Sequence, residues 1–82
     1  MSNLESKKVL IVGGSSDIGA ATAMAFAGLG AEVTIASRNQ AKLDAVAARI
    51  RRHVRTAVLD TTDEAAVEAF FATAGQFDHV VI

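Results

Sequence analysis

The pattern of hydrophobic and polar positions divides the chain into two kinds of segment. Short apolar runs alternate with longer stretches in which apolar residues recur at helical spacing. The apolar or β-branched runs at Lys8–Val12, Glu32–Ala36 and Arg55–Leu59 predict buried strands. A further run, His79–Ile82, predicts the beginning of a fourth strand. These runs are too short for helices and are bounded by glycine or polar residues, as buried strands are.

Between the predicted strands, apolar residues recur three or four positions apart, which predicts three helices. The first runs from Asp17 to Leu29, and Gly30 can close it in the left-handed conformation. Asn39 can cap the second helix and Thr62 the third, because their side chains can accept amide hydrogens of the first turn. The apolar residues at helical spacing in the first helix are Ile18, Ala21, Ala25, Phe26 and Leu29. The predicted buried stripes are Leu43, Val46, Ala47 and Ile50 in the second helix, and Val67, Phe70, Phe71 and Ala74 in the third.

This order of strands and helices predicts an α/β fold with a doubly wound parallel sheet. The 82 residues suffice for one small domain at most. Because the last apolar run coincides with the end of the sequence, we expect residues 1–82 to be the first βαβαβαβ portion of a larger domain.

Composition narrows the classes of function. Hydrophobic residues make up 51% of the chain but aromatic residues only 5%, which suits strands covered by helices on both faces. The net charge of -1 favours neither a nucleic acid nor an anionic membrane as partner. Without cysteine there is no disulfide framework or thiolate metal site, and the polar start "MSNLESKK" does not resemble a secretory signal. We therefore expect a cytoplasmic protein with no nucleic-acid or membrane partner.

A glycine- and serine-rich turn follows the first predicted strand. Gly13 lets the backbone turn sharply, while Ser15 and Ser16 are small and carry hydroxyl donors. Gly19 lets the following helix pack closely on the sheet. Ligands of open parallel sheets bind beyond the carboxyl ends of the strands, and a helix N-terminus there suits phosphate. The absence of Lys-Ser or Lys-Thr after the last glycine excludes a P-loop, and the glycine spacing is not G-x-G-x-x-G.

The stretch "GGSSDIG" resembles the first turn of the short-chain dehydrogenase/reductase family, T-G-x-x-x-G-x-G. Val12 stands in place of the family's threonine, and Asp17 in place of its middle glycine. A carboxylate near a pyrophosphate is repulsive, so we interpret Asp17 as an N-cap that points away from the ligand. The resemblance implies a Rossmann-like fold in which Gly13, Ser15, Ser16 and Gly19 hold phosphates and Ile18 packs near the nicotinamide.

The residues after the second strand bear on the choice of cofactor. A carboxylate at this position selects NAD by binding the ribose 2′-hydroxyl, whereas an arginine accepts the 2′-phosphate of NADP. Here the residues are Ser37 and Arg38, and no acid is present. This arrangement is similar to the NADP-preferring pattern of the family. It also disfavours a methyltransferase or a response-regulator-like domain, both of which need acids at these strand ends.

After the third strand, the resemblance implies that Asp60 and Thr61 flank the adenine, although both residues are also common in turns. A basic cluster at residues 49–55 is expected at the opposite edge of the sheet, where it complements a helix C-terminus rather than binding nucleic acid. Neither His53 nor His79 has a companion at metal-ligand spacing, so no metal site is predicted.

Catalytic residues are not expected within these 82 residues. The resemblance implies hydride transfer with a carbonyl or alcohol substrate, a catalytic tyrosine in Y-x-x-x-K, and a homo-oligomeric parent protein. The sequence contains no tyrosine. Two hypotheses stay open: the NADP-binding portion of a short-chain oxidoreductase, or a nucleotide-binding or NADP-sensing module without catalysis.

Overall fold

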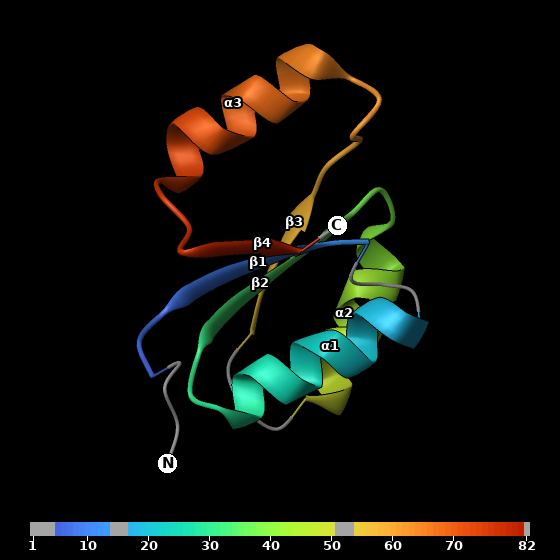
Figure 1. Ribbon diagram of the computed structural model, residues 1–82. Helices are drawn as coiled ribbons and strands as arrows, with labels where there is room; N and C mark the ends of the chain where they lie inside the picture. Colours follow the sequence, from blue (N-terminus) through green and yellow to red (C-terminus); the bar gives the residue numbers. More distant parts are fainter. Residues whose placement is uncertain (1–4, 14–16, 51–53, 82) are drawn as a thin grey trace.

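The computed structural model describes residues 5–13, 17–50 and 54–81, and its elements follow the predicted alternation (Figure 1). The fold is α/β, as the sequence predicts. The elements are β1 (Lys8–Val12), α1 (Asp17–Gly28), β2 (Glu32–Ser37), α2 (Gln40–Arg49), β3 (Val54–Val58), α3 (Glu64–Ala74) and β4 (His79–Val81).

The strands form one parallel sheet in the order β3-β2-β1-β4. In this sheet Val12 lies beside Ala36, and Ala36 lies beside Ala57, so that β1, β2 and β3 end at the same edge. Helices α1 and α2 cover one face of the sheet, and α3 lies on the other (Figure 1). The predicted doubly wound parallel arrangement is therefore confirmed, with helices on both faces of a Rossmann-like sheet.

The larger hydrophobic core lies between the sheet and the two helices α1 and α2. Its residues come from alternate positions of β1 and β2, as the period of a strand requires. Leu43 and Val46 of α2 are buried as predicted, and so is Ile50 at the end of that helix. The buried members are Val9, Ile11, Ala20, Ala23, Ala27, Ala31, Val33, Ile35, Leu43, Val46 and Ile50.

The residues that α1 buries are not the apolar residues whose helical spacing predicts the helix. Ile18 is 82% exposed and Leu29 is 44% exposed, whereas the helix buries Ala20, Ala23 and Ala27. Nearly every residue of α1 is apolar or small, so the spacing of apolar residues does not select one face. The alanines face the sheet because their small side chains let the helix backbone approach β1 and β2 closely.

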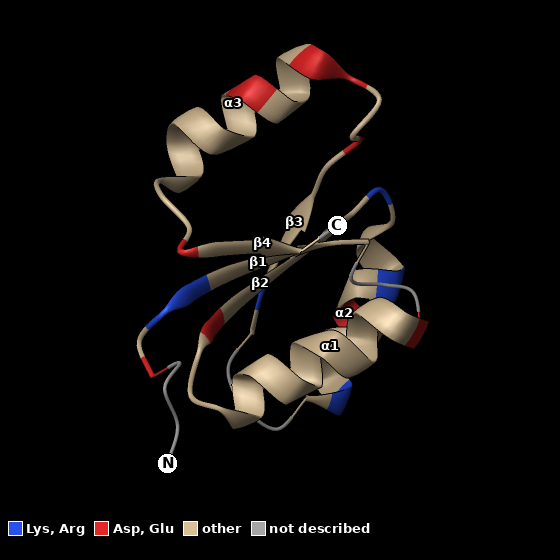
Figure 2. Ribbon diagram, in the orientation of Figure 1, with Lys and Arg blue, Asp and Glu red and all other residues tan. Residues whose placement is uncertain are grey.

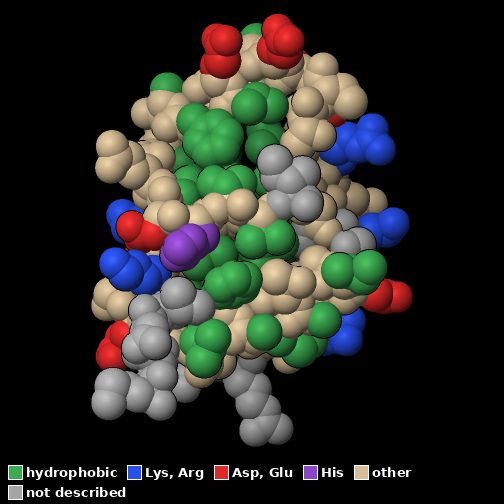
Figure 3. All heavy atoms as spheres, viewed as in Figure 1, with side chains coloured by type: hydrophobic (Ala, Val, Ile, Leu, Met, Phe, Trp, Pro, Cys, Tyr) green, Lys and Arg blue, Asp and Glu red, His purple; other side chains and the backbone are tan. Residues whose placement is uncertain are grey.

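A smaller core lies on the opposite face, between the sheet and α3. Leu10, Ala36 and Leu59 are its buried residues, and Phe70 and Phe77 pack against it. The rings of these two phenylalanines stack with their centroids 6.1 Å apart. Figure 3 shows apolar side chains gathered below α3 and also beside α1.

Helix α3 buries less than the sequence predicts, because none of its own residues is fully buried. Val67 and Phe70 pack toward the sheet as expected, but Phe71 is 40% exposed and Ala74 is exposed. The stripe is therefore half right: apolar spacing identifies the helix, but the depth at which the helix is buried depends on what packs around it.

The ends of the helices test the predicted caps. The side chain of Asn39 accepts the amide hydrogen of Lys42 at 3.1 Å, as predicted. Gly30 has a φ of +88° and follows α1, which confirms its left-handed closing role. Thr62 is not the cap of α3: Asp63 is, and it accepts the amide hydrogen of Ala66 at 3.2 Å. The Thr62 hydroxyl donates to Asp60 instead.

Candidate functional site

The carboxyl ends of β1, β2 and β3 form one edge of the sheet, and the predicted site residues follow these strands. Main-chain hydrogen bonds continue past the strand ends: Gly13 N–H donates to the carbonyl of Ala36 at 2.8 Å, and Leu59 N–H donates to that of Ser37 at 2.8 Å. Adjacent strands are about 4.8 Å apart, so the segments that follow them lie within reach of a single elongated ligand. Arg38 follows Ser37 directly, and Asp60 follows Leu59.

The turn after β1 begins with Gly13, which has a φ of +83°. This left-handed conformation favours glycine, and the space that a Cβ would occupy there is open. A ligand could therefore approach the backbone at Gly13 closely. Ser15 and Ser16, the predicted phosphate contacts, lie outside the described residues.

The beginning of α1 differs in one respect from the sequence-based interpretation. Asp17 is the first residue of the helix and is not its N-cap, because the cap position precedes it and falls outside the described residues. Its carboxylate is exposed and lies in the first turn, where it interacts favourably with the helix dipole. The start of α1 is drawn in red, the colour of acidic residues, in Figure 2.

Two other predicted contacts belong to the first turn of α1. Gly19 is half-buried, and Ile18 is 82% exposed. In the protein alone this large apolar side chain is exposed to water. A ligand packed against it would bury that apolar surface. Its position therefore suits an apolar contact with a bound molecule.

The end of β2 carries a polar and a cationic residue. Ser37 is half-buried, and its hydroxyl oxygen accepts the amide hydrogen of Asn39 at 3.4 Å. Arg38 is exposed, between the strand and the cap of α2. No carboxylate belongs to the loop after β2, in agreement with the sequence.

The end of β3 forms a tight turn around Asp60. Its Oδ1 accepts the amide hydrogen of Thr62 at 2.9 Å and the hydroxyl hydrogen of Thr62 at 2.6 Å. Its main-chain carbonyl accepts the amide hydrogen of Asp63 at 3.1 Å. Thr61, the other predicted adenine neighbour, is exposed in the same turn.

The surroundings of Asp60 favour its ionised form. The hydrogen bond from the Thr62 hydroxyl, then that from the Thr62 amide, lower the pKa of Asp60 below its ordinary value, and the Arg38 charge acts in the same direction. Partial desolvation opposes this shift without reversing it. The carboxylate is thus a charged acceptor at neutral pH, and Arg38 lies close enough for its charge to be felt at Asp60.

Sequence reasoning missed Thr62 as a residue of the site, because a threonine before a helix is first read as a cap. The spacing D-x-T, which allows an aspartate oxygen to accept from the residue two positions later, was the available signal. Cap and turn use the same residue types, so only the geometry distinguishes them.

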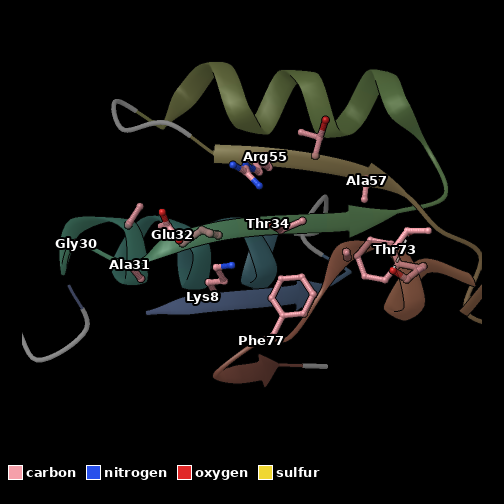
Figure 4. Close-up of a pocket in the computed structure, with 14 residues that line it drawn as sticks. Lys8, Gly30, Ala31, Glu32, Thr34, Arg55, Ala57, Thr73 and Phe77 are labelled. Atoms are coloured by element: carbon pink, nitrogen blue, oxygen red, sulfur yellow. Dashed lines mark hydrogen bonds between the residues drawn. The ribbon is translucent and has the colours of Figure 1, made fainter. Parts of the chain in front are cut away.

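A pocket of about 510 Å³ lies elsewhere, between α3 and the sheet (Figure 4). Its walls include Lys8, Glu32 and Arg55 near the amino ends of their strands, together with Thr73 and Phe77. It is therefore at the end of the sheet opposite to Gly13, Arg38 and Asp60. Because ligands of open parallel sheets bind at the carboxyl ends of the strands, this pocket is not the candidate cofactor site.

The described residues contain no group of three His, Cys, Asp or Glu side chains that could hold a metal ion. Within the same residues, no helix has the length and apolar character needed to cross a membrane.

Comparisons with known proteins agree with this geometry. Residues 7–81 match the model of the family described as short chain dehydrogenase. An uncharacterized oxidoreductase of Mycobacterium tuberculosis is 46% identical over 76 residues, which are 93% of this chain and 29% of that protein. A short-chain dehydrogenase/reductase of Stachybotrys chlorohalonatus is 35% identical and is matched over 38% of its length. The chain thus spans about a third of the length of these relatives.

Solved structures give the same result. The citronellol catabolism dehydrogenase of Pseudomonas aeruginosa superposes with a TM-score of 0.89 at 30% identity, over 98% of this chain and 37% of that one. A metagenomic short-chain oxidoreductase, solved in complex with NADP, superposes with a TM-score of 0.85 at 30% identity, over 94% of this chain and 38% of that one.

Proposed function

The chain belongs to the short-chain dehydrogenase/reductase family, and on this premise we propose that it forms the NADP-binding part of an oxidoreductase. The reaction would transfer a hydride between the nicotinamide and a carbonyl or alcohol group of a small molecule. Residues 1–82 would be the N-terminal part of the cofactor-binding domain, since the chain covers only about a third of its relatives.

The observation that carries the choice of NADP is the position of Arg38 directly after Ser37 at the end of β2, with Asp60 at the adjacent strand end. The Asp60 carboxylate lies within electrostatic reach of the Arg38 guanidinium. The segment after β2 offers a cation and a hydroxyl but no carboxylate to accept from a ribose 2′-hydroxyl. This donor set fits a 2′-phosphate, because a guanidinium donates to phosphate oxygens through a planar fork.

The remaining contacts follow from the order of the strands. The turn at Gly13 and the first amides of α1 would hold the phosphates that join the two nucleotides, with Ser15, Ser16 and Gly19 in the same turn. Ser37 would support Arg38 at the ribose. Asp60 and Thr61 would border the adenine, with Asp60 as an acceptor for an N–H donor.

The exposed side chain of Ile18 would contact the nicotinamide half of the cofactor and exclude water from it. When bound, NADP supplies the hydride or accepts it at the nicotinamide ring. The described residues would bind and orient the cofactor, and the groups that move the substrate proton are not assigned to this chain.

Titration of the full-length protein with NADPH and NADH, followed by nicotinamide fluorescence, tests the proposal. We expect NADPH to bind at least about tenfold more tightly, because a charge-assisted hydrogen bond to phosphate exceeds the about 1.4 kcal/mol that this ratio requires. Equal affinity, or tighter binding of NADH, would refute the NADP assignment.

A second candidate, an NADP-sensing module without catalysis, is favoured by one observation, the exposed carboxylate of Asp17 where the family has a glycine. The two functions differ in turnover. NADPH consumption with a panel of aldehydes and ketones would support the oxidoreductase. Tight NADPH binding without consumption of any of them would support the sensor.

A further inference from the structure

The turn between β3 and α3 contains a side chain whose role is neither packing nor capping. Thr62 is exposed, and the cap of α3 is its neighbour Asp63. The Thr62 hydroxyl donates to Oδ1 of Asp60 at 2.6 Å, and the Thr62 amide donates to the same oxygen at 2.9 Å. Thr62 is therefore bound to Asp60 through both its main chain and its side chain.

These two hydrogen bonds restrict the Asp60 carboxylate to one orientation. A half-buried aspartate without such bonds samples several rotamers, and a ligand must select one of them at a cost in binding free energy. Both bonds end on Oδ1, and within residues 5–13, 17–50 and 54–81 no hydrogen bond is made to Oδ2. The second oxygen thus retains its capacity to accept from a ligand.

The neighbouring charges support the same arrangement. Arg38 acts on the Asp60 carboxylate from the adjacent strand end. A change in the orientation of the Asp60 carboxylate would also change the electrostatic potential at the Arg38 guanidinium. The hydroxyl of Thr62 thereby influences two groups of the candidate nucleotide site without belonging to the set of residues that would contact the nucleotide.

We propose that Thr62 is a positioning residue of this site: its hydroxyl preorganises the Asp60 carboxylate for the adenine of the cofactor. This inference rests on the proposed NADP-binding function. The contact is local to the turn, so its loss should affect the affinity for the nucleotide more than the folding of the sheet.

The test compares Thr62→Ala, Thr62→Val and Thr62→Ser in the full-length protein. Alanine and valine remove the hydroxyl but keep the amide bond to Oδ1, whereas serine keeps both donors. Thr73→Ala is a matched control, because the Thr73 hydroxyl donates only to carbonyls of α3, at Ala69 and Phe70. The Kd for NADPH, the Kd for adenosine 2′,5′-bisphosphate and the Tm are measured for each variant.

We expect Thr62→Ala and Thr62→Val to raise both Kd values about threefold to tenfold. Thr62→Ser should restore both values, and Thr73→Ala should leave them unaltered. In a background of Asp60→Ala, Thr62→Ala should cause no further loss, because Thr62 would act through that carboxylate.

The inference would be overturned by any of three results. The first is an unchanged Kd for NADPH in Thr62→Ala, and the second is a raised Kd in Thr62→Ser. The third is that Thr62→Ala raises the Kd as much in the Asp60→Ala background as in the unmodified protein. Such results would leave the proposed function intact as long as the unmodified protein binds NADPH more tightly than NADH. If the unmodified protein does not bind NADPH, the proposed function fails and the inference fails with it.

Discussion

Arg38→Ala removes the cation that follows β2 and should weaken the binding of NADPH far more than that of NADH. Arg38 is exposed, so part of its interaction with a 2′-phosphate is screened by solvent and salt. A hydrogen bond to a charged group contributes about 1.5–3 kcal/mol, and exposure places Arg38 at the lower end of that range. A loss of about 1.5–2 kcal/mol corresponds to about a 10- to 30-fold increase in Kd for NADPH.

NADH has no 2′-phosphate, so the same substitution should remove only stacking between the guanidinium and the adenine. That loss is at most about fivefold. Fluorescence titration of both cofactors at fixed ionic strength measures the two changes. Arg38→Lys should give an intermediate value for NADPH, because it keeps the charge but loses the planar fork.

Arg55→Ala is the matched control for this experiment. Arg55 is near the amino end of β3, four residues before Leu59, which is about 13 Å along a strand. This exceeds the screening length of about 8–10 Å in physiological salt. If Arg38→Ala weakened both cofactors equally, or if Arg55→Ala had as large an effect, Arg38 would not be the residue that recognises the 2′-phosphate.

Three further substitutions test the strand ends. Asp17→Gly should tighten NADPH binding about fivefold by removing about 1 kcal/mol of repulsion, and unchanged or weaker binding in a titration would contradict this. Gly13→Ala should lower the free energy of unfolding in urea by about 1–2 kcal/mol, since φ is +83° there, and a stability within error of the unmodified protein would refute the strained turn. The third substitution is Thr62→Ala, studied as a function of pH. Because hydrogen bonds from Thr62 lower the pKa of Asp60, these bonds should stabilise the fold at pH values above the ordinary pKa of a carboxyl group. Their stabilisation should be lost as the pH falls through the lowered pKa of Asp60. The Tm difference between the unmodified protein and Thr62→Ala should therefore shrink as the pH is lowered into and below the ordinary carboxyl range, and a difference that does not change with pH would exclude the ionised Asp60 as its cause.

The elements and their order could be predicted from local patterns in the sequence. Apolar runs and helical spacing identify four strands and three helices because each depends on residues close together in the chain. The left-handed Gly30 and the Asn39 cap were predictable for the same reason. The family was also accessible, since the stretch from Gly13 to Gly19 carries its resemblance in consecutive residues.

How the elements face one another depends on contacts between segments that are far apart in the chain. The buried face of α1 was not predictable, because its apolar residues surround the helix and the fit of small alanines against the sheet selects Ala20, Ala23 and Ala27. The nearness of Arg38 to Asp60 likewise depends on the alignment of β2 with β3. Local patterns record which residues can form a strand, a helix or a turn, whereas contacts between distant segments exist only once the sheet has assembled.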